Sequence, residues 1–241
     1  MKCLIIAAGL GSRLRALAAS KPLAEVNGTP LIEHVVRAAR VAGLREFVIV
    51  TGYQAEALEP VLTGLADRLG VAIEIVRNPA WERPNGLSVL AAAAKLDGPF
   101  ALLMSDHLFD PAILAGLIEA HRPDAALTLA VDEDVASPTL DVDDATKVVF
   151  GECGRIAAIG KTLERYDAVD TGIFVATPAL LDAIAESVAA GGAGSLSEGV
   201  QRLADQGRAF AAPIGGGWWI DVDDAAAHAR AEAMLPAGLA A

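Results

Sequence analysis

The sequence contains little cysteine. Its 241 residues include only two, Cys3 and Cys153. Two widely separated thiols provide neither the disulfide framework of a small secreted domain nor the paired spacing of a zinc site. Both of those classes of protein are therefore excluded, and we expect a reducing, cytoplasmic environment.

Long apolar runs are also missing, although 54% of the residues are hydrophobic. Charges or turn residues interrupt the longest runs well short of the ~20 residues needed to span a bilayer. Residues 1–9 form a short apolar stretch that leads directly into a glycine-rich turn, which is typical of a first strand and not of a signal peptide. We expect a protein that is not embedded in a membrane and that has enough apolar residues for a substantial core.

Basic residues are scarce. Lys and Arg total 19 against 31 Asp and Glu, and the formal net charge is -12. A general nucleic-acid partner is excluded, because neutralising a phosphate backbone requires a basic face. Any anionic ligand must instead meet a local cluster of cations, so the few Lys and Arg near turns are the candidates for binding it.

Apolar periodicity predicts alternating strands and helices in the first half of the chain. Strands are predicted at 2–8, 46–51, 72–76 and 100–104. Helices are predicted at 30–42, 55–69 and 88–95, with a loop at 77–85. This alternation indicates a parallel sheet with right-handed crossovers and helices on both faces.

The second half has shorter strand patterns with turns between them. Strands are predicted at 126–132, 147–150, 155–160 and 172–176. Helices are predicted at 178–189, at 197–206 and from 225 onward. The sequence therefore predicts an α/β fold in which these strands extend the first sheet into a mixed, mostly parallel one.

The first predicted strand leads directly into the turn Gly9-Leu10-Gly11-Ser12-Arg13-Leu14. In an open α/β sheet the ligand crevice lies at this position, and glycines there let backbone N–H groups approach an anion. The dinucleotide fingerprint needs a third glycine where this chain has Leu14, and the P-loop needs a Gly-Lys-Ser/Thr ending that is absent. The turn therefore indicates a phosphate site of a different kind.

After a short spacer come Lys21-Pro22-Leu23 and Asn27-Gly28-Thr29-Pro30-Leu31-Ile32. Together with the turn, this pair of segments resembles the sugar-phosphate nucleotidyltransferase superfamily. The resemblance implies a Rossmann-like three-layer sandwich of the nucleotide-diphospho-sugar transferase type, in which Arg13 and Lys21 act as catalytic cations on the triphosphate. It implies nucleotide binding by Ala7, Ala8, Gly9, Gly11, Ser12, Arg13 and Lys21. Taken singly, Arg13 or Lys21 reads as an ordinary surface cation.

Two carboxylates are candidates for a magnesium site. Asp106 follows the strand at 100–104, where side chains at the carboxyl edge face the crevice. In residues 218–224, an extended backbone would place Asp221 and Asp223 on one face. The resemblance implies that Asp106 and Asp221 hold Mg2+ and that Asp106 also contacts the nucleotide. Asp223 stays open between a supporting partner of the metal site and the N-cap of the last helix.

The loop at 82–88 contains Asn85, Gly86 and Ser88. An Asn-Gly pair alone is just as typical of a turn. In context, the stretch resembles the Glu-x-x-Asn-Gly-x-Ser segment of cytidylyltransferases that make CDP-inositol and CDP-choline, which implies that these three residues bind the nucleotide near its cytidine. The preference for CTP over UTP or dTTP rests on this resemblance.

A further series of segments indicates which family within the superfamily the chain resembles. Residues 104–107, 141–148, 159–161 and 169–174 are similar to the inositol-1-phosphate cytidylyltransferase family, and the resemblance covers residues 1 to about 224. It implies that Lys147 and Lys161 bind the acceptor phosphate and assist catalysis, and that Asp170 binds acceptor hydroxyls. Solvated lysines at strand ends and a turn-capping aspartate are the plain alternatives.

The expected activity is magnesium-dependent transfer of CMP from CTP to inositol 1-phosphate, giving CDP-inositol and pyrophosphate. Phosphocholine or aminoethylphosphonate is the rival acceptor, because Trp81, Trp218, Trp219 and Tyr166 could cage a cationic head group. A catalytically silent nucleotide-binding subunit is the rival from another class. An ionised phosphate needs no general base, so His107 is interpreted as a binding or loop-fixing residue.

We expect one domain over residues 1–241. Its nucleotide-binding half would run to about residue 110, its acceptor-binding half over 111–224, and a C-terminal helix over 225–241. No nucleic-acid partner is expected. The product would feed a separate membrane phosphotransferase if one exists, and a homodimer is left open.

Overall fold

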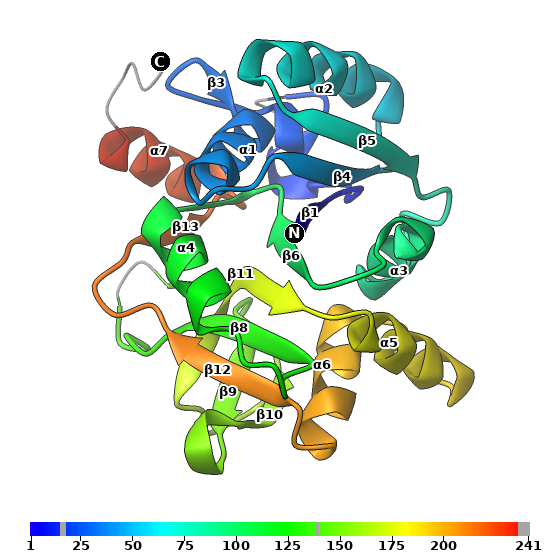
Figure 1. The fold of residues 1–241 in the computed structure, drawn as a ribbon. Coiled ribbons are helices and arrows are strands. Elements are labelled where there is room, and N and C mark those ends of the chain that lie inside the picture. The colour runs from blue at the N-terminus through cyan, green and yellow to red at the C-terminus, as the bar shows by residue number, and fades with distance from the viewer. Residues whose placement is uncertain (15–17, 138–139, 236–241) are drawn as a thin grey trace.

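The computed structural model describes residues 1–14, 18–137 and 140–235. In the first half, strands and helices alternate (Figure 1). The strands are β1 (Lys2–Ala7), β2 (Glu25–Val26), β3 (Thr29–Pro30), β4 (Glu46–Thr51), β5 (Ala72–Arg77) and β6 (Phe100–Met104). The helices are α1 (Leu31–Val41), α2 (Ala55–Leu69) and α3 (Gly86–Ala91), with 3-10 turns at Ser12–Leu14, Lys21–Leu23 and Ala93–Lys95.

The second half contributes most of the antiparallel pairing. Its strands are β7 (His107–Phe109), β8 (Leu127–Asp132), β9 (Lys147–Phe150), β10 (Ile156–Gly160), β11 (Ala168–Ala176), β12 (Ala209–Pro213) and β13 (Trp219–Asp221). Its helices are α4 (Pro111–Ala120), α5 (Ala179–Ala189), α6 (Leu196–Asp205) and α7 (Ala225–Met234), with a 3-10 turn at Glu152–Gly154.

One mixed sheet joins the two halves. Its strand order is β10-β9-β11-β6-β1-β4-β5, while β8 also pairs with β11 and β12 pairs with β8. Strands β6, β1, β4 and β5 are parallel, whereas β11 runs antiparallel to β6. The predicted mixed, mostly parallel central sheet is confirmed.

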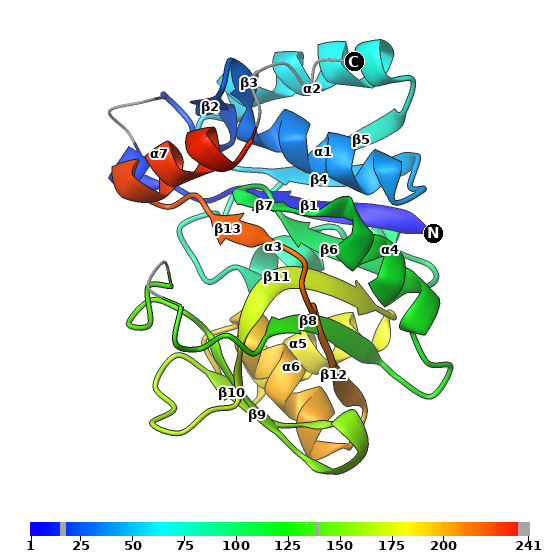
Figure 2. The ribbon, with the colours of Figure 1, turned by 90° about the vertical axis from the view of Figure 1, so that its left-hand side faces the viewer.

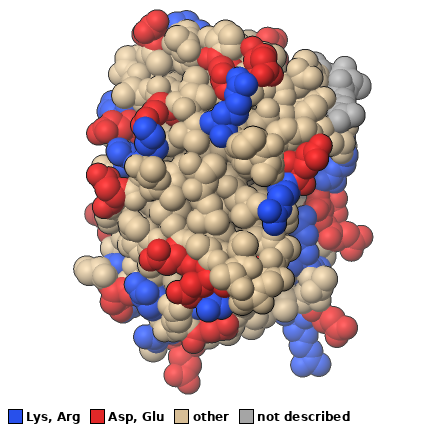
Figure 3. All heavy atoms as spheres, turned by 90° about the vertical axis from the view of Figure 1, so that its right-hand side faces the viewer, with Lys and Arg blue, Asp and Glu red and all other residues tan. Residues whose placement is uncertain are grey.

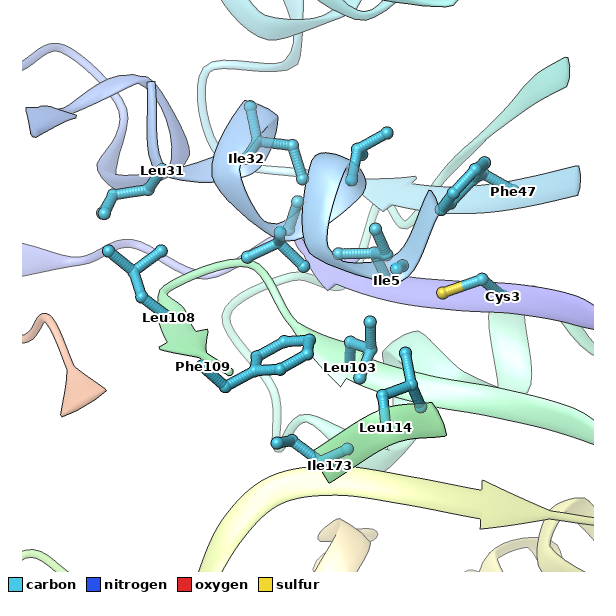
Figure 4. Packing of buried hydrophobic residues seen from close by; sticks show 14 of the residues in the cluster. Cys3, Ile5, Leu31, Ile32, Phe47, Leu103, Leu108, Phe109, Leu114 and Ile173 are labelled. Carbon is cyan, nitrogen blue, oxygen red and sulfur yellow. The ribbon is translucent and has the colours of Figure 1, made fainter. Parts of the chain in front are cut away.

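Side chains of β1 alternate between two cores. Cys3 and Ile5 face α1, α2 and α4, whereas Leu4 and Ile6 face α3, α5 and α6. Figure 4 shows the first core, in which Phe109 of β7 packs between the sheet and its helices. Alternation in a fully buried strand thus divides the molecule into three layers.

The last helix lies against the β2–β3 hairpin, far from it in sequence (Figure 2). Asn27 Nδ2 donates to the carbonyls of Glu232 (3.0 Å) and Leu235 (2.6 Å), and His228 Nε2 lies 2.6 Å from the carbonyl of Glu25. These bonds hold α7 and the segment before it, which carries Asp221 and Asp223, beside the first strand-to-helix turn.

Some predicted boundaries are wrong. The helix predicted at 88–95 begins at Gly86 and breaks into a 3-10 turn, and the strand predicted at 172–176 begins at Ala168. Helix α4 has no counterpart among the predicted elements. Its signals are nevertheless in the sequence, since Pro111 occupies the first turn and Asp110 caps it by accepting from the Ala112 N–H at 2.9 Å. Residues 236–241 of the expected C-terminal helix lie outside the described residues.

On the face shown in Figure 3, acidic and basic side chains of the described residues are interspersed around a largely uncharged centre. Within the described residues, the structure contains no helix that is both long and apolar enough to cross a membrane.

Candidate active site

The site lies at the edge of the sheet where β1, β4 and β6 end together. Because these strands are parallel, the turn after β1 and Asp106 after β6 meet there. Strand β11 starts at the same edge, since Ile173 pairs with Leu103 in the antiparallel sense. Two adjoining cavities of about 360 and 430 Å³ open at this edge, and Asp106 and Arg13 line both.

Lys21 packs directly against a glycine of the predicted phosphate turn. A Cβ on Gly11 would lie 2.3 Å from the Lys21 Cβ, and Gly11 has φ +56°. Only glycine accommodates both the left-handed backbone and this contact. The turn and Lys21 are therefore held together, with Lys21 only 8% exposed and Arg13 exposed at the cavity rim.

Three carboxylates surround the Lys21 ammonium. Its Nζ lies 2.5 Å from Asp106 Oδ2 and 3.7 Å from Asp221 Oδ1, and it also pairs with Asp223. Burial alone would lower the pKa of Lys21, but the three carboxylates outweigh it and hold that pKa above its usual value. Lys21 is therefore charged, and it offsets the mutual repulsion of the acidic groups.

His107 fixes the position of Asp221. The antiparallel pair β7–β13 places the two residues opposite each other, with His107 Nε2 3.5 Å from Asp221 Oδ2. Its Nδ1 lies 2.7 Å from the carbonyl of Thr171. Burial opposes the charged imidazole, but Asp221 and Asp106 raise the pKa of His107 to about 10. One ring nitrogen faces the Asp221 carboxylate and the other faces the Thr171 carbonyl, which is the geometry of an orienting residue.

The carboxylates of Asp106 and Asp221 fit a divalent cation. Within the described residues, the buried Asp221 Oδ1 has no hydrogen-bond partner. Ligand atoms of Asp106, His107 and Asp221 lie within 4.8 Å of one another. Magnesium prefers oxygen ligands and keeps several waters, so the two carboxylates would hold the ion and His107 would orient them. Bound there, the ion would neutralise charge on nucleotide phosphates.

Gly172 gives His107 the space that it occupies. Gly172 has φ +77°, and a Cβ there would lie 2.4 Å from His107 Nδ1 and 3.0 Å from Met104 Cγ. Gly172→Ala should therefore lower the free energy of unfolding by about 1–3 kcal/mol, the cost of such a left-handed residue, and displace His107 from Asp221. Thermal unfolding and magnesium titration measure the two effects. Gly160→Ala, with open space at its Cβ, is the matched control and should change neither; equal behaviour of the two variants would contradict this role.

A carboxylate of the larger cavity links Arg13 to Lys161. Asp144 pairs with Arg13, 131 residues away, and lies 2.5 Å from Lys161 Nζ. These two cations hold the pKa of Asp144 far below its usual value, with the Lys161 contact contributing most. Arg13 pairs also with Asp223. Sequence reasoning assigned no role to Asp144, because nothing in a loop at 141–146 indicates a partner so distant in the chain.

The predicted acceptor residues lie in two different places. Lys161 and Asp170 line the larger cavity, together with Asp132 and Trp219. Burial raises the pKa of Asp170 to about 6, against the opposing hydrogen bond from the Gly172 N–H at 2.7 Å. Lys147 is not among the described residues that line either cavity: its Nζ donates to the Lys161 carbonyl at 2.9 Å. Lys147 thus supports the Lys161 loop in this structure, and its contact with an acceptor stays a prediction.

The residues predicted to bind the nucleotide fall into two groups, those that line the smaller cavity and those that are buried behind it. Gly9, Gly11, Ser12, Arg13, Lys21, Asn85, Ser88 and Asp106 all line the smaller cavity. Ala7 and Ala8 are buried at the end of β1, where the Ala8 carbonyl accepts from the Tyr53 N–H at 3.0 Å. Gly86 is buried too, and a Cβ there would lie 2.5 Å from the Gly194 carbonyl oxygen. Gly86 is therefore needed for close packing of α3 on the loop before α6.

Comparison with known proteins agrees with this arrangement. Residues 3–203 match the MobA-like NTP transferase domain family. The chain is 36% identical over 222 residues to a bifunctional IPC transferase and DIPP synthase of Rubrobacter xylanophilus, and 31% identical over 221 residues to the protein of that name from Aquifex aeolicus. Each alignment covers 91% of this chain and 48% of the relative, so the chain spans about half the length of these relatives.

A solved structure agrees as well. The inositol-1-phosphate CTP transferase of T. maritima superimposes with a TM-score of 0.82 at 27% identity, covering 94% of this chain and 90% of that one. The chain belongs to the MobA-like NTP transferase family, within the sugar-phosphate nucleotidyltransferase superfamily.

Proposed function

We propose that the chain is a magnesium-dependent cytidylyltransferase that transfers CMP from CTP to inositol 1-phosphate, forming CDP-inositol and pyrophosphate. The observation that carries this proposal is the position of Lys21 beside Asp106 and Asp221, with Arg13 paired to Asp223, at two adjoining cavities. One cavity carries the residues expected to hold the nucleotide. The other carries Lys161, a cation suited to an incoming phosphate monoester. The similar proteins from R. xylanophilus and T. maritima support the choice of substrates.

The chemistry is a displacement at the α-phosphorus of CTP. An oxygen of the acceptor phosphate forms a bond to that phosphorus while the bond to the oxygen of the β-phosphate breaks, and pyrophosphate leaves with both electrons of that bond. An ionised phosphate carries no proton to be removed, so positioning and charge neutralisation supply the catalysis. Arg13 and Lys21 neutralise the triphosphate, while Lys161 aligns the attacking group.

Phosphate binding by these cations requires them to leave internal partners. Asp144 and Asp223 pair with Arg13, and Asp144 also pairs with Lys161. We propose that nucleotide and acceptor phosphates replace these carboxylates, with Asp223 then supporting the metal ligands. The replacement keeps each cation paired with an anion, and the displaced Asp144 and Asp223 are partly exposed to solvent.

An amine-bearing acceptor is the second candidate. The larger cavity is lined by Asp132, Asp141, Asp170 and the Trp219 ring, a setting that suits a cationic head group. A CMP-5'-(3-aminopropyl)phosphonate synthase of Streptomyces rubellomurinus is 35% identical over 133 residues, covering 54% of this chain and 20% of that protein. The hydroxyls of a polyol would donate hydrogen bonds to the same carboxylates. A polyol and a cationic head group would therefore occupy the same surface of the cavity.

The test is pyrophosphate release with Mg2+ and CTP, comparing inositol 1-phosphate, phosphocholine and aminoethylphosphonate in parallel reactions. We expect turnover with inositol 1-phosphate at least about tenfold above the amine-bearing acceptors, since a buried polar site discriminates strongly against a mismatched group. Preference for an amine would select the second candidate and make Trp219 the residue to replace. No release with any acceptor would favour a catalytically silent nucleotide-binding subunit.

CDP-inositol, the product of the proposed reaction, would supply a phosphotransferase in the membrane. We place the reaction in the cytoplasm, where free thiols such as Cys3 and Cys153 persist.

A further inference from the structure

Asp144 lies in a short turn that the fold holds in place. The N–H groups of Asp144 and Ala145 donate to the Asp141 carbonyl at 3.2 and 2.9 Å, which closes the turn on itself. Immediately after it, the Thr146 carbonyl accepts from the Asp170 N–H of β11 at 2.9 Å. The turn is therefore tied to the central sheet, and it places the Asp144 carboxylate at the wall of the larger cavity.

The two oxygens of this carboxylate contact two different cations. Oδ2 pairs with Arg13, and Oδ1 lies 2.5 Å from Lys161 Nζ. Arg13 lines both cavities and Lys161 lines the larger one. These are the cations proposed above to bind the triphosphate and the acceptor phosphate. In this structure, a single anion therefore occupies a phosphate-binding cation of each substrate at the same time.

A bound triphosphate would break both contacts. Its oxygens carry more charge than a carboxylate and fit the Arg13 guanidinium, and they would repel the adjacent Asp144 carboxylate. Loss of Arg13 also removes one of the two anchors of Asp144. The remaining pair with Lys161 is weak, because the side chains are 34% and 57% exposed and water competes for both. Lys161 is then available to the acceptor phosphate.

Resting on the proposed function, we propose that Asp144 couples the binding of the two substrates, because it bridges Arg13 and Lys161 and the nucleotide that displaces it from one cation releases the other for the acceptor. The substrate that binds first meets the cost of opening the bridge, and the second does not meet it again. The two substrates therefore favour each other's binding, by the same factor in either order. Asp144 acts through the two cations and is not itself a catalytic residue.

The decisive variant is Asp144→Asn, which keeps the side-chain shape and removes the charge. Titration calorimetry with Mg2+ would measure the affinity for inositol 1-phosphate with and without saturating α,β-methylene CTP, an analogue that cannot release pyrophosphate. The ratio of the two affinities is the coupling factor. We expect the coupling factor of the wild type to exceed that of Asp144→Asn by about fivefold or more. Direct repulsion between the two ligands is the same in both proteins, so it cancels in this comparison.

The affinities for each ligand alone separate this role from a structural one. Asp144→Asn should bind the analogue alone, and inositol 1-phosphate alone, several-fold more tightly than the wild type, because no carboxylate competes for the cations. A residue that held the turn or contacted a substrate would weaken binding when replaced. Asp143→Asn removes the same charge from an exposed neighbour in the turn and should match the wild type. Asp144→Ala repeats the test without an amide, and thermal unfolding would verify that the variants are folded.

The outcomes are distinct. Equal coupling factors in the wild type and Asp144→Asn, weaker binding of the single ligands by that variant, or equal changes in Asp143→Asn would overturn the coupling role and leave nucleotidyl transfer standing. Failure of the analogue or of inositol 1-phosphate to bind the wild type would overturn the proposed function and this inference together. A coupling factor that falls in Asp144→Asn and not in Asp143→Asn, with tighter binding of each ligand alone, would support it.

Discussion

Asp106→Ala is expected to lower the rate of pyrophosphate release by about a thousandfold or more while leaving the fold intact, since removal of a single preorganised group that stabilises transition-state charge costs two to three orders of magnitude. Asp106 lies at the carboxyl end of β6, lines both cavities and contacts Lys21 at 2.5 Å. Its loss removes a carboxylate proposed to hold Mg2+ and a partner of Lys21 together. The measurement is initial-rate pyrophosphate release over a magnesium titration.

Two further variants make this result specific. Asp106→Asn preserves the side-chain shape and should be nearly as impaired, because a neutral amide oxygen is a weak magnesium ligand. Asp97→Ala removes an aspartate whose side chain is 92% exposed and should retain full activity. Wild-type turnover in Asp106→Asn, or an equal loss in Asp97→Ala, would remove Asp106 from the mechanism.

Lys21→Met should lower kcat/KM for CTP by about 100- to 1000-fold, because it removes a preorganised charge from the triphosphate. The same substitution should not weaken the binding of magnesium. In this structure the ammonium lies among Asp106, Asp221 and Asp223, so its loss leaves three carboxylates without their shared cation. Magnesium affinity should therefore stay equal or rise, as measured by calorimetry without nucleotide.

The same variant should be less stable without metal. Removing one member of a part-buried charge cluster leaves the other charges uncompensated, so the melting temperature should fall and Mg2+ should restore part of it. Lys95→Met, which removes a half-exposed partner of Glu74, should show neither change. Weaker magnesium binding in Lys21→Met would mean that the ammonium supports the metal site and does not compete with the ion.

The structure explains why the site needs both ends of the chain. The turn after β1 supplies Arg13 and the following 3-10 turn supplies Lys21. The segment leading into α7 supplies two of the three carboxylates that surround Lys21. The link between them is the β2–β3 hairpin, whose Asn27 binds the carbonyls at the end of α7. The Asn27-Gly28 pair of the sequence signature thus has a structural role of its own: Asn27, at φ +51°, caps a helix from another part of the chain.

Local sequence determined the core strands and the edge of the sheet at which the site lies. Glycine-bounded apolar runs defined β1, β4 and β6, since a strand buried on both faces has no room for polar residues. Because parallel strands end at one edge, the same runs indicated that the Gly9–Arg13 turn and Asp106 would meet. The positive φ of Gly11 and its contact with Lys21 fit the role expected of a phosphate turn.

Only the tertiary structure decided the contacts that join distant segments. Asp144 meets Arg13 and Lys161, while Lys147 points to the Lys161 carbonyl. The orientation of the Asn85 amide depends on the N–H of Leu196, 111 residues away. Sequence fixes which groups can donate or accept, because that is a property of each residue. Which donor meets which acceptor depends on how loops and helix ends pack, and no local pattern in the chain encodes those distances.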